Sequence, residues 1–357
     1  MNFKYYKTSE EHESNIQSAR KTKTDMKKIS VQNLAETLDL SRVTIWKVIN
    51  NKPGVAPGTI QRVNDALRDF HEKNAGTHRT DPESKTVTLL ASRAETSSFW
   101  MEMINQIAFD VHAQNGVLNY IPLDRKNMSL EDLQSSLHPE KTNGLLALNI
   151  YDEELINLLS QINLPKVFYD TIPELSVDHL KGDLILLDGK QTIAKIVSQI
   201  CEEGHTKIGF IGDTHYALTN RLRWEGFIRA LQEQELSLNK SLCFTKQIKK
   251  DRYQEDISSF LKSLKIMPTA IVCVSDYVAF IVIQNLLDMG FRVPKDIKVT
   301  GYDDVKGFLL DQYHVSTIRV QTDLLGKRML NQLLYRINNP DADFEEIKIF
   351  PKEMIIL

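Results

Sequence analysis

The chain has 357 residues, of which 42% are hydrophobic and 25% charged, a composition typical of a soluble globular protein. This length favours two or three domains, and the net charge of −3 argues against a general nucleic-acid coat protein. Residues 1–86 hold 15 Lys and Arg against 11 Asp and Glu, a net +4, and the remainder holds 29 against 36, a net −7. A basic N-terminal part on an acidic remainder fits one end of the chain that meets phosphates.

The cysteines and the apolar runs indicate the cellular compartment in which the protein is expected. Cys201, Cys243 and Cys273 are odd in number and widely spaced, which favours reduced thiols over disulfides and suggests no metal site. The N-terminus lacks the apolar segment of a signal peptide, and no apolar run approaches the roughly 20 residues that cross a bilayer. We therefore expect a cytoplasmic protein without a membrane segment, metal or cofactor.

The N-terminal segments come first in chain order. Residues 1–28 are polar and predict a flexible arm. Residues 29–73 predict three short helices, the first over Val31–Leu38, the second over Arg42–Asn50 and the third from about Pro57. Ser30 and Ser41 are suitable N-caps for the first two helices. This pair has the length and turn of a DNA-binding helix-turn-helix, with a plain helical hairpin as the alternative.

The second helix of such a motif enters the major groove, and its N-terminal residues meet base edges. The candidates here are Arg42, Val43, Thr44, Trp46 and Lys47. Arg42 and Lys47 can donate hydrogen bonds to guanine or to phosphate, and Val43 can pack against a thymine methyl group.

Residues 74–86, with Gly76 and Pro82, predict a linker, and alternating strands and helices follow it. The alternation predicts parallel sheets covered by helices, and its extent over some 270 residues favours two similar lobes. The predicted strands are Val87–Ala91, Val117–Ile121, Gly144–Asn149, Lys166–Asp170, Asp183–Leu187, Lys207–Ile211, Ala270–Val274 and Lys298–Tyr302. The predicted helices include Trp100–Asn115, Gln191–Glu203, Arg221–Gln234, Tyr277–Gly290 and Leu324–Ile337.

Several segments together resemble the lactose/galactose repressor (LacI/GalR) family. The stretch from residue 29 to residue 70 resembles the family's DNA-binding headpiece, most clearly in Leu40–Asn50, Val55–Thr59 and Arg62–Ala66. The ordered later matches are Glu203–Gly212, Arg221–Phe227, Pro268–Ile271, Ser275–Asp276, Val299–Asp304 and Val315–Ile318 with Gly326. The resemblance covers nearly all of the chain after residue 28.

The resemblance implies a fold and a set of DNA contacts. The fold is a three-helix, lambda-repressor-like headpiece joined to a two-lobed α/β domain like the periplasmic binding proteins. Arg42, Val43 and Lys47 fall on base-reading positions, and Thr44, Asn50 and Lys52 on backbone-contact positions. Trp46 replaces the family's common serine. The linker positions Asn74, Thr77 and Thr80 depart from the family's hinge helix, so we expect weak minor-groove intercalation.

The resemblance also implies an effector pocket between the lobes, of a kind suited to a sugar. It places Asp170, Arg221, Ser275 and Asp303 there, with Phe99 or Trp100, Phe168 and Tyr277 as ring contacts. In the alternative interpretation, Asp170 and Asp303 are turn formers at strand ends, Arg221 is a surface residue of a helix, and the aromatic side chains belong to the core. We expect a first lobe of residues 87–182 and 320–345, and a second of residues 183–319 and 346–357.

The function that we expect is that of a DNA-binding repressor controlled by a small-molecule effector, in the form of a homodimer on a pseudo-palindromic operator. The C-terminal segment Phe350–Leu357 predicts a strand rather than a tetramer-forming helix. No GxGxxG, P-loop, GxSxG or HExxH motif supports an enzyme. The alternatives are a body that senses a nucleoside or a partner protein, and a sugar receptor that does not bind DNA.

Overall fold

A computed structural model describes residues 84–92, 98–123, 129–249, 252–305 and 310–355, together with parts of 38–63. The chain divides into an N-terminal unit, Met1–Pro82, and a C-terminal unit, Glu83–Leu357. Each unit is described here by itself.

The N-terminal unit is built around helix α3 (Arg42–Ile49). Ser41 caps this helix as predicted, because its Oγ accepts a hydrogen bond from the Thr44 N–H at 3.0 Å. Ile45, Val48 and Val63 form a small buried core. Most of the predicted first helix, the arm, Asn50, Lys52 and linker residues 74–83 lie outside the described residues.

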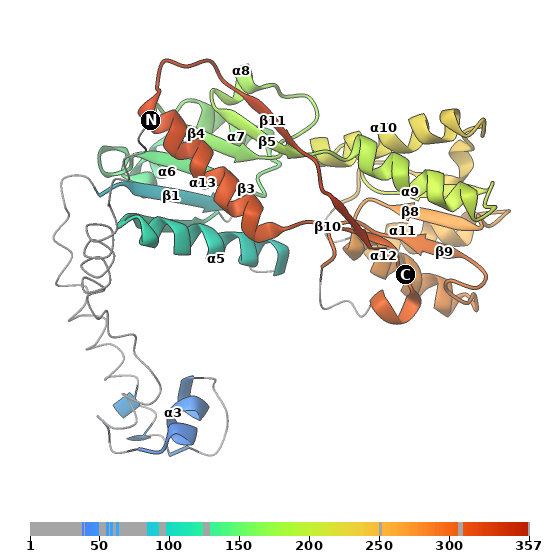
Figure 1. Ribbon diagram of the computed structural model, residues 1–357, viewed down its shortest axis with the longest axis horizontal. Coiled ribbons are helices and arrows are strands. Elements are labelled where there is room, and N and C mark those ends of the chain that lie inside the picture. Colours follow the sequence, from blue (N-terminus) through green and yellow to red (C-terminus); the bar gives the residue numbers. More distant parts are fainter. Residues whose placement is uncertain are drawn as a thin grey trace, which may run out of the picture. The chain divides into compact units, whose positions relative to one another are not determined.

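The first lobe of the C-terminal unit is a six-stranded parallel sheet covered by helices on both faces (Figure 1). Its strand order is β11 (Glu346–Ile349), β5 (Asp183–Leu187), β4 (Lys166–Tyr169), β3 (Gly144–Leu148), β1 (Thr86–Ala91) and β2 (Val117–Pro122). Helices α5 (Ser98–Ala113) and α13 (Thr322–Asn338) share one buried cluster with one face. Helices α6 (Leu130–Leu137), α7 (Glu153–Ser160) and α8 (Val177–Leu180) share another with the opposite face.

The second lobe is a four-stranded parallel sheet with the order β7 (Cys243–Phe244), β6 (Ile208–Ile211), β8 (Ala270–Cys273) and β9 (Lys298–Thr300). Its helices are α9 (Lys190–Glu202), α10 (Leu218–Glu233), α11 (Tyr253–Ser263) and α12 (Asp276–Asp288). Figure 1 places α9 and α10 above this sheet and α12 below it. The inner strands are buried along their whole length, as expected for a parallel sheet with two covered faces.

The chain crosses between the lobes at three places: after β5, between β10 (Thr317–Arg319) and α13, and between β11 and β12 (Glu353–Ile355). Strands β10 and β12 pair in an antiparallel ribbon, so the predicted C-terminal strand is confirmed.

The expected lobe boundaries are wrong at two points, because β5 and β11 belong to the first sheet and pair with each other. Both strands lie next to a point where the chain passes from one lobe to the other. The order of elements along the chain does not show which of the two sheets such a strand joins.

A buried ion pair closes the first lobe at the start of β5. Arg336 of α13 donates to Asp183 through Nη2 at 2.5 Å and through Nε at 3.1 Å. The exposed fractions of these side chains are 2% and 0%. The Gln332 amide and the Glu345 backbone N–H also donate to the Asp183 carboxylate, at 2.8 and 3.0 Å. This carboxylate therefore joins α13, β5 and the segment that leads into β11.

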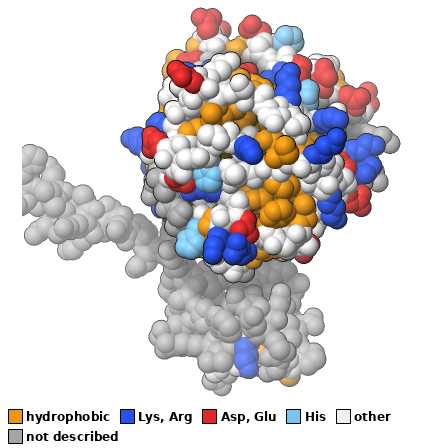
Figure 2. Space-filling model, turned by 90° about the vertical axis from the view of Figure 1, so that its right-hand side faces the viewer, with side chains coloured by type: hydrophobic (Ala, Val, Ile, Leu, Met, Phe, Trp, Pro, Cys, Tyr) orange, Lys and Arg blue, Asp and Glu red, His pale blue; other side chains and the backbone are white. Residues whose placement is uncertain are grey.

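Two further observations concern the charge on one face of the molecule and the length of its helices. Figure 2 looks onto the end of the second lobe, where hydrophobic side chains lie among Lys, Arg, Asp and Glu. A face that mixes both signs of charge lacks the single-sign potential that attracts an extended anion such as duplex DNA. Among the described residues, no helix is long and apolar enough to cross a membrane.

Candidate functional site

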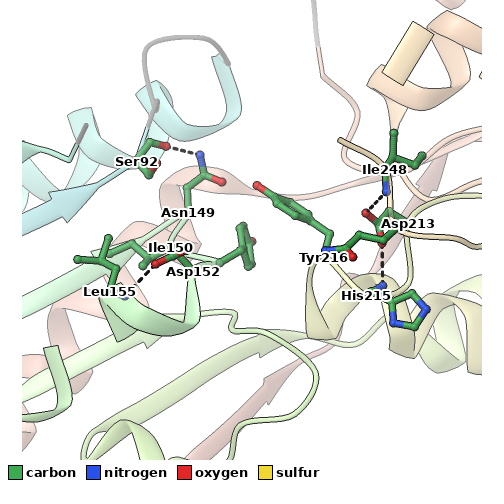
Figure 3. Close-up of a pocket in the computed structure, with 11 residues that line it drawn as sticks. Ser92, Asn149, Ile150, Asp152, Leu155, Asp213, His215, Tyr216 and Ile248 are labelled. Atoms are coloured by element: carbon green, nitrogen blue, oxygen red, sulfur yellow. Dashed lines mark hydrogen bonds between the residues drawn. The ribbon is translucent and has the colours of Figure 1, made fainter. Parts of the chain in front are cut away.

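A cavity of about 190 Å³ lies between the two lobes of the C-terminal unit (Figure 3). The first lobe contributes residues that follow β1 and β3, and the second lobe contributes residues that follow β6 and β7. Its lining residues are Ser92, Asn149, Ile150, Tyr151, Asp152, Leu155, Asp213, His215, Tyr216, Gln247 and Ile248. The carboxyl ends of parallel strands are the usual position of ligand sites in α/β sheets.

Backbone N–H groups hold the two carboxylates of the cavity wall. Asp152 caps α7, since its Oδ1 accepts a hydrogen bond from Leu155 N–H at 2.9 Å. Asp213 accepts one from His215 N–H and one from Ile248 N–H, each at 2.8 Å. Asp213 keeps further acceptor capacity, because an ionised carboxylate has about four lone-pair sites. Among the described residues that line the cavity, none is Lys or Arg.

Two tyrosines bring the lobes together beside the cavity. The rings of Tyr151, from the first lobe, and Tyr216, from the second, have centroids 4.5 Å apart at an interplanar angle of 47°. Figure 3 shows Tyr216 lying across the cavity toward the first lobe. A ligand in this cavity would contact aromatic surface from both lobes at once.

None of the eight predicted effector residues is among those that line this cavity. Asp170 is 2% exposed and accepts hydrogen bonds from Tyr151, Thr171 and Thr219. Arg221 forms an ion pair with Glu174 at 3.0 Å. Ser275 caps α12 through the Val278 N–H at 3.3 Å.

The four predicted aromatic contacts also lie elsewhere. Phe99 and Trp100 pack edge to face, with centroids 5.1 Å apart, next to Tyr169. Phe168 is 1% exposed in the core on the opposite face of the sheet. Tyr277 is 50% exposed on α12. Successive side chains of a strand point to opposite faces of the sheet. Tyr169, rather than Phe168, is therefore on the face that is nearer the lobe boundary.

Arg223 is the buried arginine at the lobe junction that the sequence interpretation missed. Its Nη1 donates to the Val274 carbonyl, and its Nη2 lies 3.4 Å from Asp303 Oδ1. Its guanidinium stands 3.6 Å from the centre of the Tyr302 ring. The helical phase could have identified it, because Arg223 shares a face with buried Thr219, Gly226 and Phe227, whereas Arg221 does not.

The carboxylates near this junction are poorly solvated. Burial raises the pKa of Asp303 to about 6, although Arg223 opposes the rise. Burial and nearby Asp303 raise the pKa of Asp276 to about 7, while hydrogen bonds from Thr317 and Val305 oppose it. Asp276 stabilises the turns between β9 and β10, because its carboxylate accepts hydrogen bonds from Thr317 Oγ1 at 2.7 Å and from the Val305 N–H at 2.8 Å.

The described part of the headpiece places two of the predicted DNA contacts. Thr44 is half-buried, and its Oγ1 lies 2.8 Å from the capping Ser41 Oγ. Lys47 is half-buried in the last turn of α3. Arg42, Val43 and Trp46 lie in α3, but their side chains are outside what the structure describes. The assignment of all seven contacts remains a prediction.

Known proteins with similar sequences span almost the whole chain. Residues 197–356 match a family model described as a periplasmic binding protein-like domain. The HTH-type transcriptional repressor PurR of Mannheimia succiniciproducens is 27% identical over 330 residues, 91% of this chain and 97% of that protein. The protein of the same name from Haemophilus influenzae Rd is 27% identical over 334 residues, 92% and 97% of the two chains.

Solved structures agree in fold. A complex of the transcriptional regulator CelR with cellobiose has a TM-score of 0.66 at 19% identity, covering 92% of this chain and 99% of its own. The Lac repressor bound to ONPG has a TM-score of 0.64 at 17% identity, covering 92% and 98%. Both comparisons agree with the resemblance to the LacI/GalR family that the sequence motifs indicate. The similarity in fold over 92% of the chain confirms the predicted architecture of a headpiece joined to a two-lobed α/β domain. The similar proteins are named as transcriptional repressors and regulators.

Proposed function

We propose that this chain is a member of the LacI/GalR family, and that it is a cytoplasmic, sequence-specific transcriptional repressor whose operator binding is controlled by a small molecule held between its lobes. The observation that carries the proposal is the cavity lined by both lobes, in a chain whose N-terminal unit has a capped helix where the second helix of a helix-turn-helix is predicted. A ligand that binds two lobes at once has different affinity for their different arrangements, which is the requirement for a population shift.

The chemistry of the cavity favours an uncharged ring-bearing effector, a sugar or a nucleoside. Tyr151 and Tyr216 offer aromatic surface, and Asn149 and Gln247 offer amide groups. Asp213 can accept hydrogen bonds from hydroxyl or amino groups, but its negative charge repels a phosphate. Sugar phosphates and nucleotides therefore fit this wall less well than their uncharged parents. The CelR structure was solved with cellobiose, which adds support for the sugar.

We propose a homodimer as the DNA-binding form. Exposed large hydrophobic side chains lie on α5, on the edge strand β2 and on α12: Met101, Phe109, Tyr120, Tyr277 and Leu287. Phe109 is 69% exposed. Such surfaces are typical of protein–protein contacts, and the Lac repressor structure bound to operator is described as a dimer. Two-fold symmetry would place two headpieces on two half-sites.

Selection of bound duplexes from a random pool with the full-length chain tests the DNA-binding proposal. We expect enrichment of a site with two half-sites of opposed orientation. Lys47→Ala should weaken binding to this site by about 1–3 kcal/mol while changing binding to unrelated duplex much less. An equal loss on both duplexes would make Lys47 a phosphate contact. The absence of any enriched sequence at moderate salt would overturn the proposal.

A thermal-shift screen of the full-length chain with sugars, nucleosides and their phosphates tests the effector class. A ligand present at 100 times its dissociation constant should stabilise the folded state by about 2.7 kcal/mol. The phosphates should give smaller shifts than the uncharged compounds. Tyr216→Leu should abolish the shift, and Tyr335→Leu, at an exposed tyrosine of α13 that does not line the cavity, should retain it. Larger shifts with the phosphates would contradict the charge argument.

A further inference from the structure

A second cavity, with a volume of about 240 Å³, lies within the first lobe, at the end of its sheet where β1 begins (Figure 1). Lys85 of this first-lobe cavity precedes β1, whereas Ser92 of the cavity between the lobes follows it. Because a strand rises about 3.3 Å per residue, these two residues lie about 20 Å apart, at opposite ends of the sheet. The lining residues of the first-lobe cavity are Lys85, Val87, Val111, Gln114, Gly116, Leu330, Leu334 and Asn338.

Aliphatic side chains form the inner wall of the first-lobe cavity. Val87 of β1, Val111 of α5 and Leu330 of α13 belong to one buried cluster, and half-buried Leu334 packs against it. An apolar cavity of about 150 Å³ holds a molecule of benzene. The first-lobe cavity is therefore large enough for a six-membered ring, or a branched aliphatic chain, that carries one polar group.

Two packed helices fix the shape of this cavity. Near the start of α13, a Cβ atom at Gly326 would lie 2.9 Å from the Met103 carbonyl oxygen of α5, so the absence of a side chain allows the two helices to approach closely. Further along the two helices, the cavity opens beside Val111 and Leu330. Its walls belong to helices and a strand rather than to a loop, so a ligand would enter a site that is already formed.

The rim of the first-lobe cavity carries one cation and two amide groups. Lys85 Nζ donates a hydrogen bond to Asn338 Oδ1 at 2.8 Å, which leaves the Asn338 amide N–H groups to act as donors. Gln114, just after α5, supplies the second amide. None of the described residues that line this cavity is Asp or Glu. N–H donors and a positive charge around an apolar interior match a carboxylate on an apolar body.

We propose that the first-lobe cavity is a second small-molecule site, which takes a monocarboxylate with an apolar body of about six to eight carbon atoms. The apolar body lies against Val87, Val111 and Leu330, and the carboxylate accepts hydrogen bonds from Lys85 and Asn338. The cavity between the lobes has the opposite charge preference, because Asp213 is among its described lining residues and no Lys or Arg is. The inference goes beyond the proposed function and does not depend on it.

Titration of the full-length chain with benzoate, followed by NMR of labelled Val, Leu and Ile methyl groups, locates the site. Benzoate has about nine non-hydrogen atoms, for which we expect a dissociation constant of about 1 mM. The methyl resonances of Val87, Val111 and Leu330 should shift along one saturable curve. Those of Leu155 and Ile248, which line the cavity between the lobes, should stay unchanged. The absence of a saturable shift at Val87, Val111 and Leu330 would overturn the proposal, wherever else benzoate binds.

The same titration tests the role of the charge. Benzyl alcohol, which has the same ring without a negative charge, should bind the parent chain about tenfold more weakly than benzoate. Lys85→Met removes the cation and should weaken benzoate binding about tenfold, while leaving benzyl alcohol binding unchanged. Lys327→Met, at an exposed lysine of α13 that does not line the cavity, is the matched control and should bind benzoate as the parent does. Equal benzoate affinity in Lys85→Met and the parent would mean that Lys85 only neutralises the C-terminal ends of α5 and α13, and would overturn the assignment of a carboxylate ligand.

A variant that fills the cavity keeps the proposal testable if Lys85→Met does not fold. Leu334→Phe places a larger side chain at a half-buried position of the cavity wall, so it should abolish saturable binding of both benzoate and benzyl alcohol. Leu324→Phe, at an exposed leucine of the same helix that does not line the cavity, should retain both. Benzoate binding of parental strength in Leu334→Phe would refute the site.

Discussion

Asp183→Asn should lower the free energy of unfolding of the C-terminal unit by about 3–5 kcal/mol, the usual loss when one partner of a buried ion pair is removed. The reason is that Arg336 is 2% exposed and would keep its charge without the opposite charge of Asp183. The substituted amide also cannot accept all the hydrogen bonds that Gln332, Glu345 and Arg336 now donate. The measurement is denaturant unfolding followed by circular dichroism.

Two variants sharpen this result. Arg336→Lys keeps the charge but loses the two-pronged geometry of the guanidinium, so it should give a smaller loss than Asp183→Asn. Lys348→Gln breaks an exposed pair with Glu346 and should change the free energy of unfolding by about 0–1 kcal/mol. A loss below about 1 kcal/mol for Asp183→Asn would show that this ion pair does not hold the C-terminal segment in place.

Gly226→Ala should destabilise the second lobe by about 1–3 kcal/mol or more, because it overpacks the contact between α9 and α10. A Cβ atom at this position would lie 2.3 Å from the Lys190 carbonyl oxygen and 2.9 Å from the Lys190 Cα. These are backbone atoms in the first turn of α9, so no side-chain rotation relieves the clash. The two helices would have to separate.

Thermal unfolding of the full chain measures this effect. Gly58→Ala is the control, since Gly58 is helical and no atom lies within 4 Å of a Cβ built there. Alanine in a helix is favoured over glycine by about 1 kcal/mol, so this control should be neutral or stabilising. An unchanged melting temperature in Gly226→Ala would mean that α9 and α10 can adjust their spacing freely.

The sequence was sufficient for the order of elements in the C-terminal unit. All eight predicted strands are present, and the bounds of the predicted strands and helices are within three residues of those observed. Strands such as Asp183–Leu187 are continuous apolar runs, and helices such as Thr322–Asn338 have a clear helical period, so the local pattern and the fold agree. Strands β7, β10 and β11 were missed. Strands β7 and β10 have only two and three residues, which carry no period, and β11 is a short edge strand of four residues.

The cavity was harder to predict than the fold. Asn149, Tyr151, Asp213 and Tyr216 each follow a buried strand, and this position was the available signal. The family resemblance directed attention instead to Asp170, whose carboxylate the chain itself satisfies. Which polar residue at a strand end is satisfied internally depends on contacts between residues some 50 positions apart, such as Asp170 and Thr219, and no local pattern encodes these.

The return of the C-terminal segment has a consequence for synthesis of the protein. Strand β11 completes the edge of the first sheet beside β5, and β12 completes the ribbon with β10. Strand β11 follows every strand of the second sheet in the chain. A polypeptide made from its N-terminus therefore cannot complete the first sheet until all four strands of the second sheet have been synthesised. The first lobe is the first to be started and its sheet is the last to be finished.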